Sequence, residues 1–328
     1  TGSRTDRMVS EPTVDDDIPY ESPVVQNNYS IGDKRNVELS KTERGTINDQ
    51  VKSIIETKNP DELTDEDIEL LRQYTGQGGL VQEEPGDTGV LNQHYTDYET
   101  IRAIYNVLDN IEGFEYDNVL EPAGGSGNFL GLNPNKQWTT VEIDYTNNQV
   151  LQLLYPKASH YFQSFEGFNK GGFDLVVSNV PFLERRGEEK LIKGGRPDIK
   201  TLHDYYIVSA LNNVRDNGII AFVTSTGTMD KKNQKIREEI ISKADFLGSY
   251  RLPEGHFEKG AHTKVTTDII FLQKRPKGVE SRNPELNNLF VNTVEETYEE
   301  QEGLKINSYY KENEDHVLGN LKIGTNIM

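Results

Sequence analysis

The 328-residue sequence predicts an α/β fold in which helices cover both faces of a doubly wound, largely parallel sheet that ends in an antiparallel hairpin. Two patterns indicate this class. Short apolar runs alternate with helical segments through the middle of the chain, which is typical of parallel sheets buried on both faces. Two β-rich runs, 246–252 and 265–273, then follow each other across a glycine-containing loop and favour an antiparallel pair.

The expected elements follow in order along the chain. A short helix at 64–74 begins with a capping pattern, Thr64 followed by Asp67. It leads into Thr75-Gly76-Gln77-Gly78-Gly79-Leu80, a glycine-rich turn that can cradle an anion or simply connect two elements. The remaining expected elements are helices at 97–108, 145–154 and 202–214 and strands at 118–121, 139–143, 174–178 and 218–224.

Composition divides the chain further. Hydrophobic residues make up 34% and the mean hydropathy is −0.70, so part of the chain is expected to be solvated. We expect an acidic, loosely packed lead-in at 1–60, a helical extension at 61–93, the α/β domain at 94–275 and a polar, acidic extension at 276–328. Because no apolar run is long enough to span a membrane, we expect a cytoplasmic protein.

The residue types also exclude some chemistry. The sequence has no cysteine, which rules out disulfides, thiolate metal sites and cysteine nucleophiles. Its histidines are too scattered to suggest a metal centre, so no metal is expected. The net charge of −19 argues against broad, unassisted binding to a phosphate backbone, since that affinity comes from Lys and Arg. Any contact with nucleic acid therefore needs a local basic element or a partner.

A candidate cofactor site follows the strand at 118–121. Glu121-Pro122-Ala123-Gly124-Gly125-Ser126-Gly127 joins that strand to a helix start, where glycines allow close approach and free amides face a ligand. The next strand ends at Glu142, Ile143 and Asp144. Glu142 can accept hydrogen bonds from two ribose hydroxyls, or it can be a solvated strand end. The pattern suits a nucleotide-like cofactor.

A candidate catalytic loop, Asn179-Val180-Pro181-Phe182, follows the strand at 174–178. Amino methylation needs acceptors that orient the NH₂ group and an apolar face that holds the base. The Asn179 oxygen and the next backbone carbonyl can accept both amine hydrogens, Phe182 can stack on a flipped base, and Pro181 stiffens the loop. An ordinary Asn-Pro turn would look the same if this loop stood alone.

Taken together, these motifs resemble the N6-adenine DNA methyltransferases of the gamma arrangement, in which the cofactor motif precedes the catalytic one. The sequence is most similar to the methylase section of large phage- and plasmid-type methylase-helicase polypeptides. That similarity covers roughly 70–275, with a weaker match at 309–319. It rests on the segments 74–80, 179–182, 202–205, 224–230, 251–253 and 266–271.

The resemblance implies a Rossmann-like class I methyltransferase sheet and S-adenosylmethionine as the cofactor. It also implies that His94-Tyr95-Thr96 is an upstream motif whose Thr helps to hold the methionine end. Val180 replaces the family's proline, a change that keeps the backbone carbonyl, and Gln163 and Ser164 stand where the family has an adenine-contacting Asp. The residues expected to contact the cofactor are Tyr95, Thr96, Glu121, Pro122, Ala123, Gly125, Gly127, Glu142, Ile143, Gln163, Ser164 and Asn179.

Candidate DNA contacts lie after the catalytic loop. The polar segment 183–200 can meet phosphates, or it can be a plain solvated loop. His203, Asp204 and Tyr205 can order this segment, or serve in the core or as a cap. The basic residues of the segment are Arg185, Arg186, Lys190, Lys193, Arg196 and Lys200.

Three functions remain open at this stage. The first is transfer of a methyl group from S-adenosylmethionine to the N6 amine of adenine in DNA, with a helicase domain or subunit as a further partner. The second is methylation of a protein glutamine, whose amide suits a similar loop. The third is a non-catalytic anti-restriction or binding protein with the same fold. The absence of cysteine excludes methylation at cytosine carbon 5, which needs a thiolate, and the choice of adenine rests on the resemblance. The same resemblance implies a bacterial or phage-encoded protein.

Overall fold

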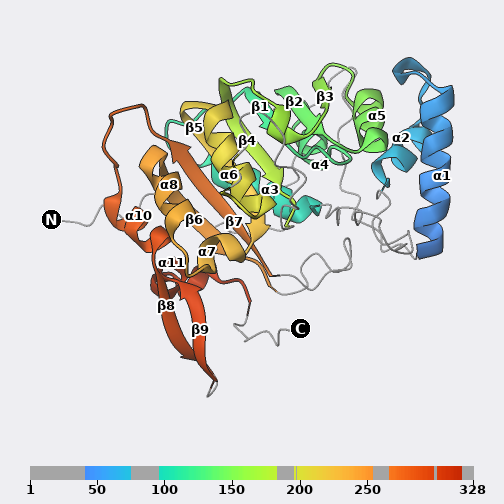
Figure 1. Ribbon diagram of the computed structural model, residues 1–328. Coiled ribbons are helices and arrows are strands. Elements are labelled where there is room, and N and C mark those ends of the chain that lie inside the picture. Colours follow the sequence, from blue (N-terminus) through green and yellow to red (C-terminus); the bar gives the residue numbers. More distant parts are fainter. Residues whose placement is uncertain are drawn as a thin grey trace.

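The computed structural model describes residues 41–74, 96–182, 196, 198–253, 266–298 and 301–319. In this part of the chain, seven strands form one sheet in the order β3-β2-β1-β4-β5-β7-β6 (Figure 1). The strands are β1 (Asn118–Glu121), β2 (Gln137–Glu142), β3 (Ser159–Phe162), β4 (Phe173–Asn179), β5 (Val214–Ser225), β6 (Ala244–Arg251) and β7 (Thr267–Lys274). Strand β7 runs antiparallel to β5 and β6, whereas the other pairs are parallel. The predicted doubly wound sheet with its final antiparallel hairpin is confirmed.

Helices cover both faces of the sheet and give it two cores. Side chains alternate between the faces along each strand, so Leu175 and Val177 of β4 enter one core and Val176 enters the other. The first face carries α1 (Lys41–Thr57), α2 (Asp65–Arg72), α3 (Tyr98–Asp109), α4 (Asn128–Leu132) and α5 (Tyr145–Leu154). The second carries α6 (Leu202–Asn213), α7 (Gly227–Asp230), α8 (Lys235–Lys243), α10 (Pro284–Val291) and α11 (Ser308–Glu312). None of these helices is both long enough and apolar enough to cross a bilayer.

Helix α1 lies within the segment that composition assigned to a loosely packed lead-in. Three of its apolar residues, Ile47, Val51 and Ile54, recur at helical spacing and join the first core. Helices α1 and α2 both pack against α5, at the outer end of the sheet (Figure 1). From residue 41 onward that part of the expectation is wrong, because three well-spaced apolar side chains are enough to fix one helix face.

The segment after residue 275 also folds against the sheet. Helices α10 and α11 enter the second core, and between them β8 (Thr293–Tyr298) and β9 (Gln301–Asn307) form a hairpin that projects from the end far from α1 (Figure 1). The chain then returns to the edge strand, where the Leu318 amide donates to the Arg251 carbonyl at 2.9 Å. The expected division of the chain at 60, 93 and 275 stays a prediction.

Candidate active site

The candidate site lies at the carboxyl edge of the parallel strands. Open α/β sheets bind ligands at this edge, next to the point where the strand order reverses. Here the order reverses between β1 and β4. Glu121, Glu142 and Asn179 are the last residues of β1, β2 and β4, so the fold brings all three to one edge.

The glycine-rich turn after β1 is closed by backbone hydrogen bonds. The Gly127 amide donates to the Gly124 carbonyl at 2.9 Å, and the Gly124 amide donates to Val141 of β2 at 3.1 Å. Gly127 has a φ of 85°, and a Cβ built on it would lie 2.5 Å from the Tyr155 ring. A side chain at this position would be strained and would collide with Tyr155, which explains the glycine. Pro122, Ala123 and Gly125 lie within the same turn.

Glu142 links this turn to the start of α5. One of its oxygens accepts from the Gly125 amide at 2.7 Å and the other accepts from the Asp144 amide at 2.7 Å. Burial raises the pKa of Glu142 to about 7, although these backbone amides act in the opposite direction. The Ile143 amide also acts on this carboxylate, which keeps acceptor capacity that can serve a ribose hydroxyl.

Glu121 is a buried carboxyl with an acceptor to spare. Its side chain is 3% exposed, and within the described residues its Oε2 atom has no hydrogen-bond partner. Burial first, and the charge of Glu142 second, raise the pKa of Glu121 well above its ordinary value. A buried polar atom without a partner is costly, so a cationic or hydrogen-bond-donating ligand would be stabilised here.

The upstream motif reaches the same turn. Thr96 is buried, and its carbonyl accepts from the Asn128 side chain at 3.0 Å, at the first residue of α4. Asp97 then caps α3 by accepting from the Thr100 amide. Residue 96 is therefore fixed beside the glycine turn, while Tyr95 lies outside the described residues.

An exposed apolar rim borders Glu142. Ile143 is 53% exposed although it directly follows the buried end of β2. Tyr145 and Phe162 are 59% and 56% exposed, and their rings meet edge to face with centroids 5.6 Å apart. These two aromatics were missed from the sequence, where Phe162 ends β3 and Tyr145 begins α5 without a local pattern that joins them. Such a rim suits the flat face of a nucleobase.

Gln163 and Ser164 follow β3 beside this rim. The Gln163 amide donates to the Glu142 carbonyl at 3.1 Å, which ties the segment to β2. The Ser164 hydroxyl accepts from the Glu166 amide at 3.3 Å and so caps a short 3₁₀ turn. The structure therefore brings both residues next to Glu142.

The candidate catalytic loop leaves the sheet at Asn179. Asn179 is paired with Val223 of β5, and the Val180 amide donates to the Val223 carbonyl at 3.0 Å. The Val180 side chain is buried in the second core. Pro181 and Phe182 are half-buried, with Phe182 against the first core. The two cores thus hold the loop from either side of the sheet.

A buried polar cluster follows at the start of α6. Asp204 accepts from the Lys231 ammonium at 2.7 Å and from the Thr201 hydroxyl at 2.8 Å, which joins the start of α6 to the residue after α7. His203 is buried beside Lys231, and burial is the main cause that lowers its pKa to about 4. Tyr205 enters the second core. His203 and Asp204 therefore fix the α6–α7 contact.

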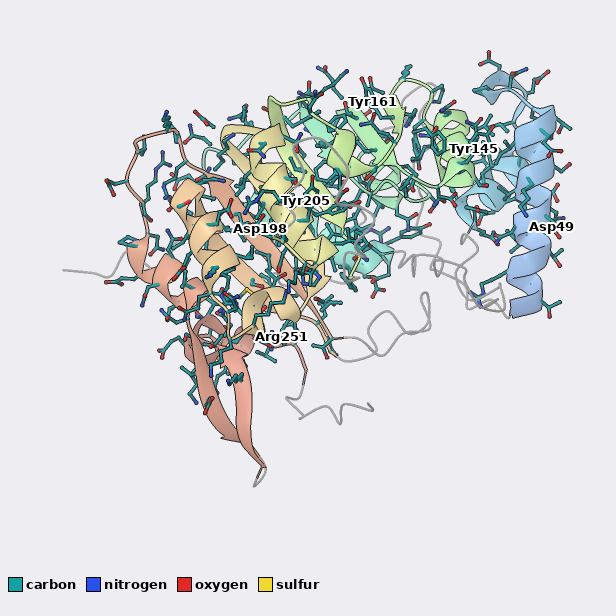
Figure 2. All side chains as sticks on the ribbon, in the orientation of Figure 1. Asp49, Tyr145, Tyr161, Asp198, Tyr205 and Arg251 are labelled. Atoms are coloured by element: carbon teal, nitrogen blue, oxygen red, sulfur yellow. The ribbon has the colours of Figure 1, made fainter. Side chains whose placement is uncertain are left out.

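A second charged cluster lies where β6 ends and β7 begins. Arg251 donates to Asp268 at 2.8 and 2.9 Å and also pairs with Asp230 at 2.9 Å. Its guanidinium lies 4.4 Å from the centre of the Tyr310 ring. Tyr145 and Arg251, labelled in Figure 2, lie toward opposite ends of the sheet. The candidate cofactor residues thus lie toward one end and this ion cluster toward the other.

Comparison with known sequences decides the family. Residues 142–318, more than half of the chain, match the family model of N-6 DNA methylases. The chain belongs to the N-6 DNA methylase family. The matched region begins at Glu142. It contains the candidate catalytic loop, the polar cluster around Asp204 and the charged cluster around Arg251.

Relatives and solved structures agree with this family and with the fold. The chain is 28% identical over 228 residues to the Defense against restriction protein B of Escherichia phage P1. The match covers 68% of this chain but 10% of that protein, so the chain spans about a tenth of that relative's length. A candidate class I S-adenosylmethionine-dependent methyltransferase from Listeria monocytogenes has a TM-score of 0.51 at 17% identity, covering 69% of this chain and 73% of that one. The modification subunit of a candidate type I restriction enzyme from Vibrio vulnificus has a TM-score of 0.50 at 19% identity, covering 74% and 60%. With the strand order above, these likenesses show the class I methyltransferase fold.

The predicted phosphate contacts of this N-6 DNA methylase family member are only partly described. Arg185, Arg186, Lys190 and Lys193 lie outside the described residues. Arg196 is bonded to two carboxylates, Asp198 at 2.6 Å and Glu239 at 2.8 Å, whereas Lys200 is exposed. The guanidinium of Arg196 is therefore already engaged within the protein.

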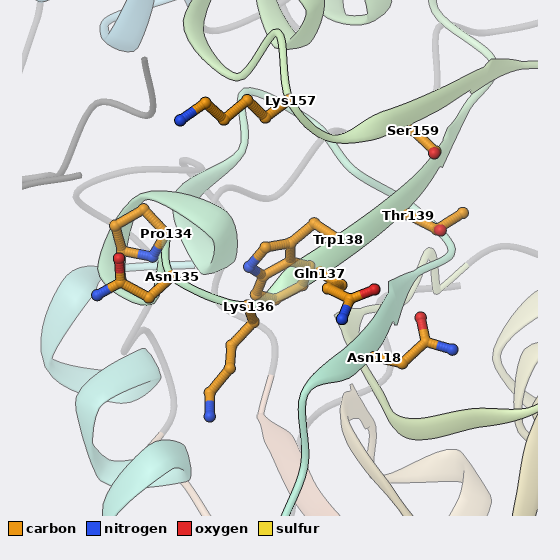
Figure 3. A pocket seen from close by; sticks show the side chains of 9 residues that line it. All are labelled: Asn118, Pro134, Asn135, Lys136, Gln137, Trp138, Thr139, Lys157 and Ser159. Carbon is orange, nitrogen blue, oxygen red and sulfur yellow. The ribbon is translucent and has the colours of Figure 1, made fainter. Parts of the chain in front are cut away.

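A polar groove lies at the opposite edge of the sheet from these family motifs. It has a volume of about 430 Å³ and opens at the amino ends of β1, β2 and β3 (Figure 3). Lys136 and Lys157 line it, and the Lys136 ammonium donates to the Tyr116 carbonyl at 2.8 Å. None of the candidate catalytic or cofactor residues lines this groove.

Proposed function

We propose that this chain is a methyltransferase unit that transfers a methyl group from S-adenosylmethionine to the N6 amine of adenine in DNA. One observation carries the proposal. Asn179 ends β4 on the same sheet edge where β1 and β2 end in buried carboxyls, in a member of the N-6 DNA methylase family. The edge therefore offers acceptors for a cationic cofactor and for an exocyclic amine.

The described residues fit S-adenosylmethionine by charge and by shape. The free acceptor of Glu121 suits the ammonium of the methionine part, and the Glu142 carboxylate suits the ribose hydroxyls. The rim of Ile143, Tyr145 and Phe162 suits the adenine ring of the cofactor. When bound, the cofactor supplies an electrophilic methyl group on a sulfonium sulfur.

The loop residues act on the target amine. The Asn179 side-chain oxygen and the Val180 carbonyl accept its two hydrogens, which draws the nitrogen lone pair out of conjugation with the ring. Phe182 stacks on the flipped base. The nitrogen then forms a bond to the methyl carbon while the carbon–sulfur bond breaks, and the excess proton leaves to solvent. Direct attack by an amine needs no thiolate, in agreement with a sequence that has no cysteine.

The test is a transfer assay with labelled S-adenosylmethionine and unmethylated DNA, single-stranded and duplex, followed by digestion to nucleosides. We expect label in 6-methyladenine. Asn179→Ala should lower transfer by about 100-fold or more, because a positioned acceptor in the transition state is lost. Its cofactor dissociation constant should stay near that of wild type, and Asn212→Ala, an exposed position on α6, is the matched control. Retained transfer in Asn179→Ala would refute the catalytic role.

The same assay separates the other functions. Label in a protein fraction and none in DNA would indicate glutamine methylation. Cofactor binding without any transfer would indicate a non-catalytic role. Because the relative named above is a Defense against restriction protein, we would propose anti-restriction as that role. Transfer that appears only when a helicase or another DNA-binding domain is added would indicate that this partner provides the affinity for DNA.

A further inference from the structure

The cations at the α6–α8 end of the site edge divide into two groups. Arg196, Lys231 and Arg251 are bonded to carboxylates, and Arg237 is buried and donates to three backbone carbonyls. Three lysines differ from them. Lys200, Lys232 and Lys235 are exposed and form no ion pair within the described residues.

These three lysines lie at one corner of the molecule. Lys200 precedes the residue that caps α6, Lys232 follows α7, and Lys235 is the first residue of α8. The Lys231 ammonium donates to the Thr201 hydroxyl at 3.1 Å, so the chain neighbours Lys200 and Lys232 are held close together. The buried Asp204–Lys231 pair thus fixes the corner that the exposed lysines occupy.

The corner lies at the same carboxyl edge of the sheet as Asn179. Helices α6 and α8 run back from the carboxyl edge, because each connects that edge to the start of a strand parallel to β4, so their first residues lie at this edge. A base flipped into the catalytic loop brings its flanking phosphates to this edge as well.

The local charge at the corner opposes that of the whole chain. The net charge is −19, yet here the three acids Asp204, Asp230 and Asp268 lie against three cations, Lys231, Arg237 and Arg251. Asp198 and Glu239 are bonded to Arg196, and Glu239 is also bonded to Lys243. Of the exposed acids nearby, Glu238 has no cationic partner in the described structure, so three free lysines face one free carboxylate.

We propose that Lys200, Lys232 and Lys235 bind the phosphates that flank the target base in DNA. The inference rests on the proposed function, since it needs DNA as the substrate. It adds two DNA contacts, Lys232 and Lys235, that the sequence did not suggest. It excludes Arg196 as a DNA contact, because the guanidinium of Arg196 is bonded within the protein. A phosphate backbone is bound mainly by such free cations, independently of base sequence.

The test measures DNA affinity at several salt concentrations for Lys200→Ala, Lys232→Ala, Lys235→Ala and the triple variant. Each lost contact should lower the slope of log affinity against log salt by about 0.9 for duplex DNA. The triple variant should lose close to three times that amount. In the transfer assay its KM for DNA should rise while kcat at saturating DNA and the cofactor dissociation constant stay unchanged. Lys232→Arg, which keeps the charge, should restore wild-type affinity.

The matched control is Lys157→Ala, an exposed lysine in the groove at the opposite edge (Figure 3). It should change neither the slope nor KM. Slopes equal to wild type in all corner variants, with transfer to DNA intact in wild type, would overturn this proposal alone. A wild-type chain that neither binds nor methylates DNA would overturn the proposed function together with it.

Discussion

The two ends of the site edge treat buried acids in opposite ways. At the β1–β2 end, Glu121 and Glu142 are buried side by side, and the pKa of each is raised, mainly by burial. At the β5–β7 end, Asp204 and Asp268 are just as deeply buried, but each is bonded to Lys231 or Arg251. Among the residues that the structure describes, the first end carries buried acids without a cationic partner, and the second carries acids that are neutralised within the protein.

The difference indicates what each end can bind. Buried carboxyls without cationic partners keep electrostatic and hydrogen-bonding capacity for a ligand, and a cation is the ligand that they favour. Neutralised carboxylates have no such capacity left, but their bonds hold neighbouring segments in place. The first end therefore suits a cationic cofactor, whereas the second forms a rigid scaffold beside an anionic substrate.

The largest effect should come from breaking the scaffold. Arg251→Met removes the partner of Asp268, whose side chain is fully buried. An uncompensated buried carboxylate costs about 3–5 kcal/mol of unfolding free energy. Urea unfolding of the variant and of wild type measures this loss.

The double variant Arg251→Met, Asp268→Leu is the control for that experiment. Because it removes both charges, it should recover most of the lost stability. If the single variant were as stable as wild type, the ion pair would not hold this end of the sheet.

The next effect is a pH dependence at the cofactor end. The folded pKa of Glu142, about 7, is above its ordinary value of 4.5, so the folded protein binds a proton that the unfolded chain does not. The stability that this proton contributes is complete below pH 4.5 and is lost as the pH rises through 7. Wild type compared with Glu142→Gln should therefore lose about 3 kcal/mol of relative unfolding free energy between pH 4.5 and pH 8.

Urea unfolding of both proteins at several pH values measures the dependence. The Gln variant cannot titrate at this position, so it corrects for the other groups of the chain. A difference between the two proteins that is constant with pH would show that Glu142 titrates normally.

The two ends also differ in how much of their structure could be predicted from the sequence. The turn around Gly127 and the strand ends at Glu121 and Glu142 are contiguous motifs, and the structure has the strands and the turn at the expected residues. The Asp204–Lys231 and Arg251–Asp268 pairs join residues 27 and 17 positions apart on different elements. No local pattern specifies such pairs, because their partners meet only once the sheet has formed.

The aromatic rim and α1 were missed for related reasons. Tyr145 and Phe162 lie on different elements, and only the parallel pairing of β2 with β3 brings their rings together. Helix α1 is too polar to stand out by composition, and its few apolar residues become informative only against the surface of α5. Short-range motifs thus predicted the strands and turns that carry the candidate site, whose cofactor and catalytic roles stay predictions, whereas long-range packing determined the rest.

A smaller loss should follow from filling the glycine turn. Gly127→Ala places a Cβ at a φ of 85° and against the Tyr155 ring. We expect about 2 kcal/mol lower unfolding free energy, with a weakened cofactor affinity, because strained backbone of this kind costs about 1–3 kcal/mol. Gly113→Ala, also at positive φ but with no atom near its Cβ, is the control that isolates the collision with Tyr155. Equal losses in the two variants would show that backbone strain alone matters.

The smallest effect tests the unpartnered acid itself. Glu121→Gln keeps the shape of the side chain. The unfolding free energy should change by less than about 1 kcal/mol, because no cation of the described part of the chain pairs with this buried carboxyl. The variant cannot carry a negative charge, however, and so attracts an ammonium less. We expect the dissociation constant for S-adenosylmethionine to rise about tenfold, which corresponds to about 1.4 kcal/mol. Calorimetric titration measures it, with sinefungin, which has the same methionine-type ammonium, as a second ligand whose affinity should fall by a similar factor. An unchanged affinity for both ligands would mean that Glu121 contributes no charge to the cofactor site, and the contrast between the two ends would then rest on Glu142 alone.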